Sequence, residues 1–187
     1  MRVIAGSARG MRLAAPRGTD TRPTADRVRE ALFSILQAKS DIEGSRILDI
    51  CAGTGALGLE ALSRGAGLCC FVENERNALI ALIKNIATIG CKESVKVMEM
   101  DAVRALKLLS NQDKLFDIIF FDPPYQSNLY SLVTEAISDF HLLAENGILV
   151  AESSVRYPLA EKIGNLIKSD RRIYGDTALE FYNWEKQ

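Results

Sequence analysis

From residue 45 onward the sequence alternates between short apolar segments and amphipathic segments, and this alternation constrains the fold more than any other feature. The apolar segments predict strands at residues 46–50, 69–73, 95–100, 116–121 and 148–152. The amphipathic segments between them predict helices at residues 56–65, 75–90, 102–109 and 129–140. Strands and helices that alternate at this spacing form βαβ units, which build a parallel sheet with helices on both faces. We therefore expect an α/β fold.

Both ends of the chain depart from this alternation. Residues 2–16 contain two short extended pieces, which predict a small N-terminal β-hairpin, and a helix is predicted over residues 26–36. A further helix is predicted at residues 159–167, and residues 171–185 predict two strands joined by a Gly-Asp turn. The predicted sheet has seven strands, is mostly parallel and ends in an antiparallel hairpin.

Size and composition fit one globular domain. A chain of 187 residues that is 48% hydrophobic and 25% charged can bury a core without a metal ion or a disulfide. Its four cysteines have no CxxC spacing and lie in apolar segments, so we expect reduced core side chains and no metal site. No apolar run approaches the roughly 18 residues of a membrane span. We expect a single cytoplasmic domain over residues 1–187, with an extension at 1–40 and a core at 41–187.

A glycine-rich loop follows the first predicted strand of the core. Gly53, Gly55 and Gly58 have the GxGxxG spacing, which brings backbone close to a ligand at a helix N-terminus. Glu73 lies 20 residues after Gly53, at the place where a dinucleotide fold has its acidic residue. The loop by itself predicts a nucleotide-like ligand and leaves a nicotinamide-dependent oxidoreductase open.

Two further acidic residues favour S-adenosylmethionine over a dinucleotide. Asp49 precedes the loop, where it can hold the ammonium group of a methionine moiety and would repel a pyrophosphate. Asp101 follows the third predicted strand, where it can accept a hydrogen bond from an adenine amino group. Each acid also has a purely structural interpretation as a helix cap, and Asp101 directly precedes a predicted helix.

The most specific motif is DPPY, residues 122–125, at the end of the fourth predicted strand. Proline pairs can simply end strands, but this strand end is expected beside the glycine loop. An exocyclic amine has its lone pair delocalised into the ring, so methyl transfer to it requires acceptors for both N–H groups. The Asp122 carboxylate and the Pro123 carbonyl can accept them, since Pro123 and Pro124 bring no competing N–H donor. Tyr125 offers a face on which an extruded base can stack.

Charge is distributed unevenly along the chain. Residues 1–29 contain seven arginines and two aspartates, a net charge of +5, and the remainder carries −6, for a total of −1. An arginine-rich arm on an acidic body fits phosphate contacts, because the guanidinium group matches the paired oxygens of a phosphate. We expect Arg9, Arg12 and Arg17 to contact RNA. A solvated surface arm is the alternative interpretation.

Six segments together resemble the RsmD-type 16S rRNA guanine-N2 methyltransferases of bacteria. They cover nearly the whole chain in family order, at residues 2–13, 22–33, 48–66, 71–75, 120–125 and 174–182. The resemblance implies a Rossmann-like class I methyltransferase fold, S-adenosyl-L-methionine as the donor and one guanine of 16S rRNA as the substrate. Amino-group methylation of DNA, which shares the DPPY type of motif, stays open as an alternative.

The resemblance also implies roles for individual residues. Glu73 would bind the ribose hydroxyls of the donor, and Thr24 would help to close the donor pocket. The implied donor-binding set is Thr24, Asp49, Ala52, Gly53, Gly55, Glu73, Asp101 and Ala102. The implied catalytic set is Asp122, Pro123, Pro124 and Tyr125. We expect a monomer that acts on an assembled or assembling small ribosomal subunit, without a membrane partner.

Overall fold

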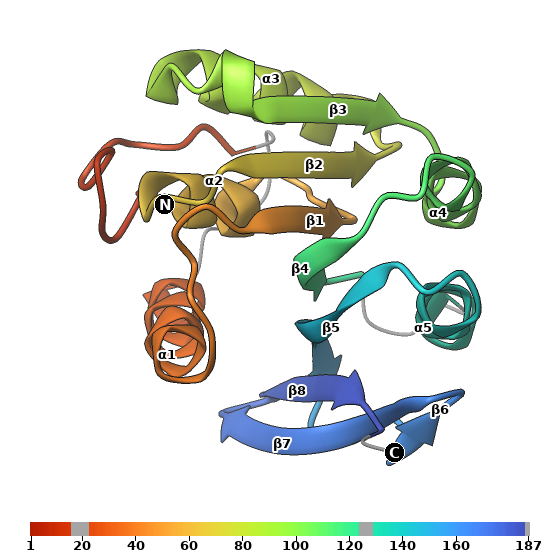
Figure 1. Cartoon of the computed structure of the whole chain (residues 1–187). Coiled ribbons are helices and arrows are strands. Elements are labelled where there is room, and N and C mark those ends of the chain that lie inside the picture. Colours follow the sequence, from red (N-terminus) through yellow and green to blue (C-terminus); the bar gives the residue numbers. More distant parts are fainter. Residues whose placement is uncertain (16–22, 124–128, 186–187) are drawn as a thin grey trace.

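The computed structural model describes residues 1–15, 23–123 and 129–185, with only the backbone of residues 23–25 (Figure 1). The helices are α1 (Pro23–Lys39), α2 (Ala56–Ser63), α3 (Arg76–Ile89), the short 3-10 helix η1 (Lys92–Ser94), α4 (Ala102–Ser110) and α5 (Leu129–Asp139). The strands are β1 (Arg46–Ile50), β2 (Leu68–Glu73), β3 (Val95–Glu99), β4 (Phe116–Phe121), β5 (Leu143–Ser154), β6 (Lys162–Ile163), β7 (Leu166–Tyr174) and β8 (Thr177–Trp184). Within the described ranges, no helix has the length and apolarity needed to cross a membrane.

All of the strands join one eight-stranded sheet, in the order β3-β2-β1-β4-β5-β8-β7-β6. The strands from β3 to β5 are parallel, and β8, β7 and β6 pair antiparallel. This arrangement confirms the predicted α/β class, the mostly parallel sheet and the closing hairpin at Gly175 and Asp176. The strand order reverses between β1 and β4, and such a reversal opens a ligand crevice at the carboxyl ends of the strands.

Two apolar cores lie on opposite faces of the sheet. One core packs α1, α2, α3 and the N-terminal segment against the sheet through residues such as Leu32, Leu59 and Leu82. The other core packs α4 and α5 through residues such as Leu106 and Ile137. Figure 1 shows α1 on one side of the sheet and α4 and α5 on the other. Alternate residues of each strand therefore contribute to different cores, as the near-continuous apolar strands require.

The helix predicted at residues 159–167 is wrong. This segment contains β6, a turn and the first residues of β7, which accounts for the eighth strand. Gly164 lies in the turn with φ of +56°, and a Cβ there would come 2.3 Å from Ser138 Oγ. Ser138 Oγ also accepts a hydrogen bond from the backbone N–H of Asn165 at 3.0 Å. A short apolar run has no decisive periodicity, and contacts with a distant helix determine its conformation here.

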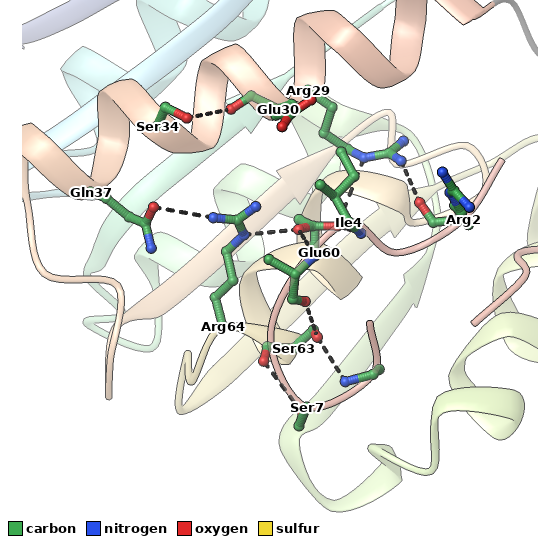
Figure 2. Close-up of polar contacts among 12 residues, drawn as sticks. Arg2, Ile4, Ser7, Arg29, Glu30, Ser34, Gln37, Glu60, Ser63 and Arg64 are labelled. Carbon is green, nitrogen blue, oxygen red and sulfur yellow. Dashed lines mark hydrogen bonds and ion pairs between the residues drawn. The ribbon is translucent and has the colours of Figure 1, made fainter. Parts of the chain in front are cut away.

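The predicted N-terminal hairpin is present as a short antiparallel connection anchored on α2. Arg2 and Arg12 form an antiparallel bridge, and the N–H of Val3 donates to the carbonyl of Met11 at 3.0 Å. The fully buried Glu60 carboxylate accepts from the N–H groups of Ile4 at 2.7 Å and Ala5 at 3.0 Å (Figure 2). The first residues of the chain are therefore fixed to the core by a buried charge.

Two arginines neutralise that buried charge from either side. Arg64 Nε donates to Glu60 at 2.8 Å, and Arg29 Nε of α1 lies 3.9 Å from the same carboxylate (Figure 2). Arg29 is 4% exposed, and burial lowers its pKa, against the opposing effect of Asp26 and Glu60. This network joins α1, α2 and the N-terminal segment. It places Arg29 beside the crevice at the carboxyl ends of the strands.

Candidate active site

A cavity of about 960 Å³ opens at the carboxyl ends of β1, β2, β4 and β5. Its lining includes six of the residues predicted from the sequence, which are Asp49, Ala52, Gly53, Glu73, Asp122 and Pro123. The two predicted groups, one for the donor and one for the base, therefore share one cavity. This volume is in the range of pockets that enclose a small-molecule ligand.

Asp49 lines the cavity and is 2% exposed. Its Oδ2 accepts the N–H of Gly58 at 2.9 Å, so it caps the first turn of α2, whose residue before the helix, Gly55, has no side chain to do so. Burial raises the pKa of Asp49 to about 7, the Gly58 hydrogen bond opposes this rise, and the charge of Glu73 adds to it. The structural and the ligand-binding interpretations of Asp49 are thus compatible, because no hydrogen bond from the described residues occupies its second oxygen.

Glu73 ends β2 and fixes the loop that faces it. Its Oε2 accepts the N–H of Gly53 at 2.7 Å, and its Oε1 accepts those of Asn74 and Glu75, each at 2.8 Å. A carboxylate has about four acceptor positions, so these bonds leave capacity for ligand hydroxyls. Glu73 therefore positions the glycine loop as well as lining the cavity.

Each of the three glycines in the loop occupies its position for a different structural reason. Gly53 has φ of +56°, and a Cβ there would meet only the Cys51 carbonyl oxygen, at 4.0 Å, so its open side faces the cavity. A Cβ at Gly55 would come 2.4 Å from Leu82, and one at Gly58 would come 2.4 Å from Phe71. Among the described residues, Gly53 thus leaves open space in the cavity lining, whereas Gly55 and Gly58 allow close helix packing. A donor contact by Gly55 stays a prediction.

A buried amide supports the same loop from behind. Asn85 of α3 is 1% exposed, and its Nδ2 donates to the carbonyl of Thr54 at 2.9 Å. Its Oδ1 accepts the N–H of Ala14 at 2.7 Å, and its Nδ2 also donates to the Ala14 carbonyl at 3.0 Å. The sequence did not single out Asn85, because an amide inside an amphipathic helix gives no signal of a tertiary contact.

Asp101 and Ala102 lie outside the set of residues that line this cavity. Asp101 is exposed and caps α4, since its Oδ1 accepts the N–H of Arg104 at 2.9 Å. The alternative interpretation of Asp101 as a helix cap is therefore confirmed. Contact of Asp101 or Ala102 with the donor stays a prediction.

Asp122 follows β4 and enters the cavity beside Asp49. The expected neighbourhood is confirmed, because β4 pairs in parallel with β1 and Ile50 is opposite Phe121. Asp122 is exposed as a residue, yet the protein around its carboxyl group displaces water, and this desolvation raises its pKa well above the usual value. The charges of Glu152 and Asp49 raise the pKa further. Pro123 is buried and lines the cavity, whereas Pro124 and Tyr125 lie outside the described residues.

Several cavity residues come from parts of the chain that the sequence did not connect with a site. They include Met1, two residues of α1 (Val28 and Leu32), Glu152 of β5, and the turn between β7 and β8 at residues 174–177, whereas Arg29 of α1 was expected near the donor pocket and does line the cavity. Glu152 ends a predicted strand, so the rule that identified Asp122 would also have identified it. Cys51 lines the cavity and is only partly buried, which corrects its prediction as a core residue.

The remaining predicted residues are not part of the cavity lining or lie outside the described residues. Arg9 and Arg12 are exposed on the N-terminal hairpin. Arg17 and the side chain of Thr24 lie outside the described residues, although the backbone of Thr24 belongs to the first turn of α1. RNA contacts by the arginines and pocket closure by Thr24 stay predictions.

The cavity residues fit the donor that the sequence implied. S-adenosylmethionine carries an ammonium and a sulfonium cation, and Asp49 and Glu73 are among the acidic residues that line the cavity. Gly53 has no side chain, so a ligand in the cavity could approach the backbone of the loop closely. The chemistry of this set suits a cation with hydroxyl groups better than it suits a pyrophosphate.

Comparison with known proteins agrees with this geometry. Residues 1–183 match the model of a family described as "Conserved hypothetical protein 95". The Bacillus subtilis protein YlbH is 38% identical over 182 residues, which cover 97% of this chain and 98% of the relative. The Escherichia coli K12 protein named ribosomal RNA small subunit methyltransferase D is 34% identical over 187 residues, covering 100% of this chain and 91% of the relative.

A solved structure extends the similarity to three dimensions. The Escherichia coli protein yhhF has 32% sequence identity and a TM-score of 0.85, and the match covers 100% of this chain and 99% of that one. The similarity therefore includes the N-terminal hairpin and the antiparallel strands β6 to β8, and it is not confined to the parallel part of the sheet.

Proposed function

Since the chain belongs to the family of the RsmD-type rRNA methyltransferases, we propose that it methylates the exocyclic N2 amino group of one guanine in 16S rRNA. The methyl donor is S-adenosylmethionine. One observation carries the proposal: Asp122 and Pro123, the first two residues of DPPY, line the same cavity as Asp49, Gly53 and Glu73. An amine held at Asp122 and a donor held at Gly53 would then meet inside one cavity.

The donor half of the cavity binds and orients. Bound S-adenosylmethionine supplies an electrophilic methyl group on a sulfonium centre. Asp49 and Glu73 offer carboxylate oxygens to its ammonium and ribose hydroxyl groups, and the Gly53 backbone lies against it. Contacts by Ala52, Gly55, Asp101, Ala102 and Thr24 complete the proposed donor site.

The substrate half holds the amine and receives a proton. The Asp122 carboxylate and the Pro123 carbonyl accept the two N–H groups of N2, which localises the nitrogen lone pair for attack on the methyl group. As the new N–C bond forms, the bond between the methyl group and the sulfonium sulfur would break and leave its electron pair on the sulfur. The nitrogen then carries one proton too many, and the Asp122 carboxylate takes it. The raised pKa of Asp122 favours this transfer, because a more basic carboxylate is a better proton acceptor. Pro124 and Tyr125 complete the proposed base site.

The proposed substrate is rRNA in an assembled or assembling small subunit, bound by a monomeric cytoplasmic enzyme. The names of curated relatives support rRNA over DNA as the substrate class. A nicotinamide-dependent oxidoreductase has less support, because no described feature beyond the loop and Glu73 favours it.

The test uses small subunits from a strain that lacks the modification. After incubation with the protein and S-adenosylmethionine, nucleosides are analysed by mass spectrometry, and N2-methylguanosine is the expected product. Asp122→Ala should lower single-turnover rates by about a hundredfold or more and leave the donor Kd close to that of the wild type. A methyl group on another atom, or on DNA only, would refute the proposal.

A further inference from the structure

Glu152 lies beside Asp122 at the carboxyl end of the neighbouring parallel strand. In the pairing of β4 with β5, Phe121 is opposite Ala151, so Asp122 and Glu152 each lie one residue beyond this pair. Both side chains line the cavity. Asp49 lies on the same face of the sheet. It is opposite Phe120 in the pairing of β1 with β4, and Phe120 shares a face with Asp122, two residues further along β4.

The surrounding structure holds Glu152 at this point of the sheet. Its carbonyl oxygen accepts the hydroxyl of Tyr130 at 2.8 Å, and the Tyr130 ring packs edge-on against Phe121 with centroids 5.6 Å apart. On its other side Glu152 pairs with Leu179 of β8, and the turn at residues 174–177 completes that wall of the cavity. The backbone that carries the carboxylate is thus fixed between two strands.

Two adjacent carboxylates in one cavity repel each other. This repulsion is visible as the contribution of Glu152 to the raised pKa of Asp122. A ligand edge that carries several N–H donors would relieve it, because each carboxylate then gains a charge-assisted hydrogen bond. Glu152 lies next to Asp122, which the proposed function assigns to the base, so the ligand edge in question would be that of the base.

The Watson–Crick edge of guanine has the required pattern, with two N–H groups on N2 and one on the adjacent N1. We propose that Glu152 is a specificity-determining residue that accepts the N1–H of the target guanine while Asp122 accepts from N2. This inference rests on the proposed function. Adenine has an acceptor at N1, which would face a carboxylate, so the pair of acids selects guanine by repulsion as well as by attraction.

The test compares guanine with 2,6-diaminopurine at the target nucleotide in reconstituted small subunits. Diaminopurine keeps the 2-amino group and has an acceptor at N1. The wild type should prefer guanine by about a hundredfold or more in kcat/KM, as sites built to bind an N–H group reject analogues that lack it. Glu152→Gln places an amide N–H where N1 can accept it, so the preference should shift toward diaminopurine by at least about tenfold.

Two further variants separate recognition from folding. Glu145→Gln makes the same change at an exposed position of the same strand, away from the cavity lining, and should leave the preference unchanged. Glu152→Asp keeps a carboxylate, so it should lower turnover and retain the guanine preference even if the Gln variant is unstable. Guanine and diaminopurine also differ at C6, but this difference is the same for every variant. A change in base preference between variants therefore reports the contact of residue 152 with N1.

The outcomes distinguish this inference from the proposed function. A wild type that yields N2-methylguanosine, together with Glu152 variants whose base preference is unchanged, overturns the role of Glu152 alone. A wild type that yields no N2-methylguanosine from the small subunits with guanine at the target overturns the proposed function and the inference with it. A loss of guanine preference in Glu152→Gln but not in Glu152→Asp supports the inference.

Discussion

At the scale of the residue, a donor bound at Asp49, as proposed, would couple its binding to protonation of that carboxyl group. Its pKa is about 7 in the free protein because it is buried, with a further contribution from Glu73. Below that pH the carboxyl group is mostly neutral, and a bound cation would have to displace its proton. Binding of a cationic donor and protonation of Asp49 therefore compete.

We predict that S-adenosylmethionine binds more weakly as the pH falls through 7. The Kd should be about tenfold higher at pH 6 than at pH 8, since about one proton is released on binding. Isothermal titration calorimetry in buffers of different ionisation enthalpy measures both the affinity and the released proton. Asp49→Asn keeps an acceptor for the Gly58 N–H and should remove the pH dependence. A wild-type Kd that is constant from pH 6 to 8 would contradict this prediction.

At the scale of the element, the N-terminal hairpin depends on close contact with α2. The N–H of Ser7 donates to the Ser63 carbonyl at 2.7 Å, and Ser63 Oγ donates to the Ala5 carbonyl at 2.6 Å (Figure 2). A Cβ at Gly6, where φ is +82°, would lie 1.8 Å from that Ser63 carbonyl oxygen. Gly10 also has positive φ, at +83°, but a Cβ there meets no atom within 4 Å.

This difference provides a matched pair of substitutions. Gly10→Ala adds only the left-handed backbone strain, about 1 to 2 kcal/mol, whereas Gly6→Ala adds the same strain and a clash with main chain. Gly6→Ala should therefore lower the free energy of unfolding more, by at least about 1 kcal/mol relative to Gly10→Ala. Urea denaturation followed by circular dichroism compares the two. Equal destabilisation would show that the hairpin yields without affecting the core.

At the scale of the whole molecule, two arginines of the basic N-terminal segment, Arg9 and Arg12, lie on a fixed part of the surface. Glu60 and Ser63 hold the hairpin against α2, and the hairpin leaves Arg9 and Arg12 exposed. The acidic remainder of the chain would repel RNA, so attraction has to come from the basic end. Under the proposed function, the N-terminal hairpin would therefore dock the RNA, and the cavity would select the base.

We predict that replacing Arg9, Arg12 and Arg17 together by Ala weakens small-subunit binding and its salt dependence. Each lost phosphate contact should reduce the slope of log affinity against log salt by about 0.7 to 0.9. The donor Kd should stay unchanged. A control triple variant, Lys92→Ala, Lys107→Ala and Lys114→Ala, removes the same charge from exposed positions outside the hairpin. An equal change of slope in both variants would show that net charge, and not the hairpin, governs docking.

The sequence by itself determined the class of the fold and the central residues of the site. Strand and helix periods, the glycine loop and DPPY depend on neighbours in the chain, so local patterns reveal them. Parallel strands also bring their carboxyl ends to one edge, which is why Asp49, Glu73 and Asp122 were predicted together.

The tertiary structure alone decided which distant segments complete the cavity. Met1, Val28, Glu152 and the turn at residues 174–177 meet there only because the N-terminal segment, α1 and the antiparallel strands pack around the same strand ends. It also decided that residues 159–167 form strand and turn, and that Glu60 is buried between two arginines. Such outcomes depend on long-range packing and on the removal of water from charged groups, neither of which a local pattern of residues contains.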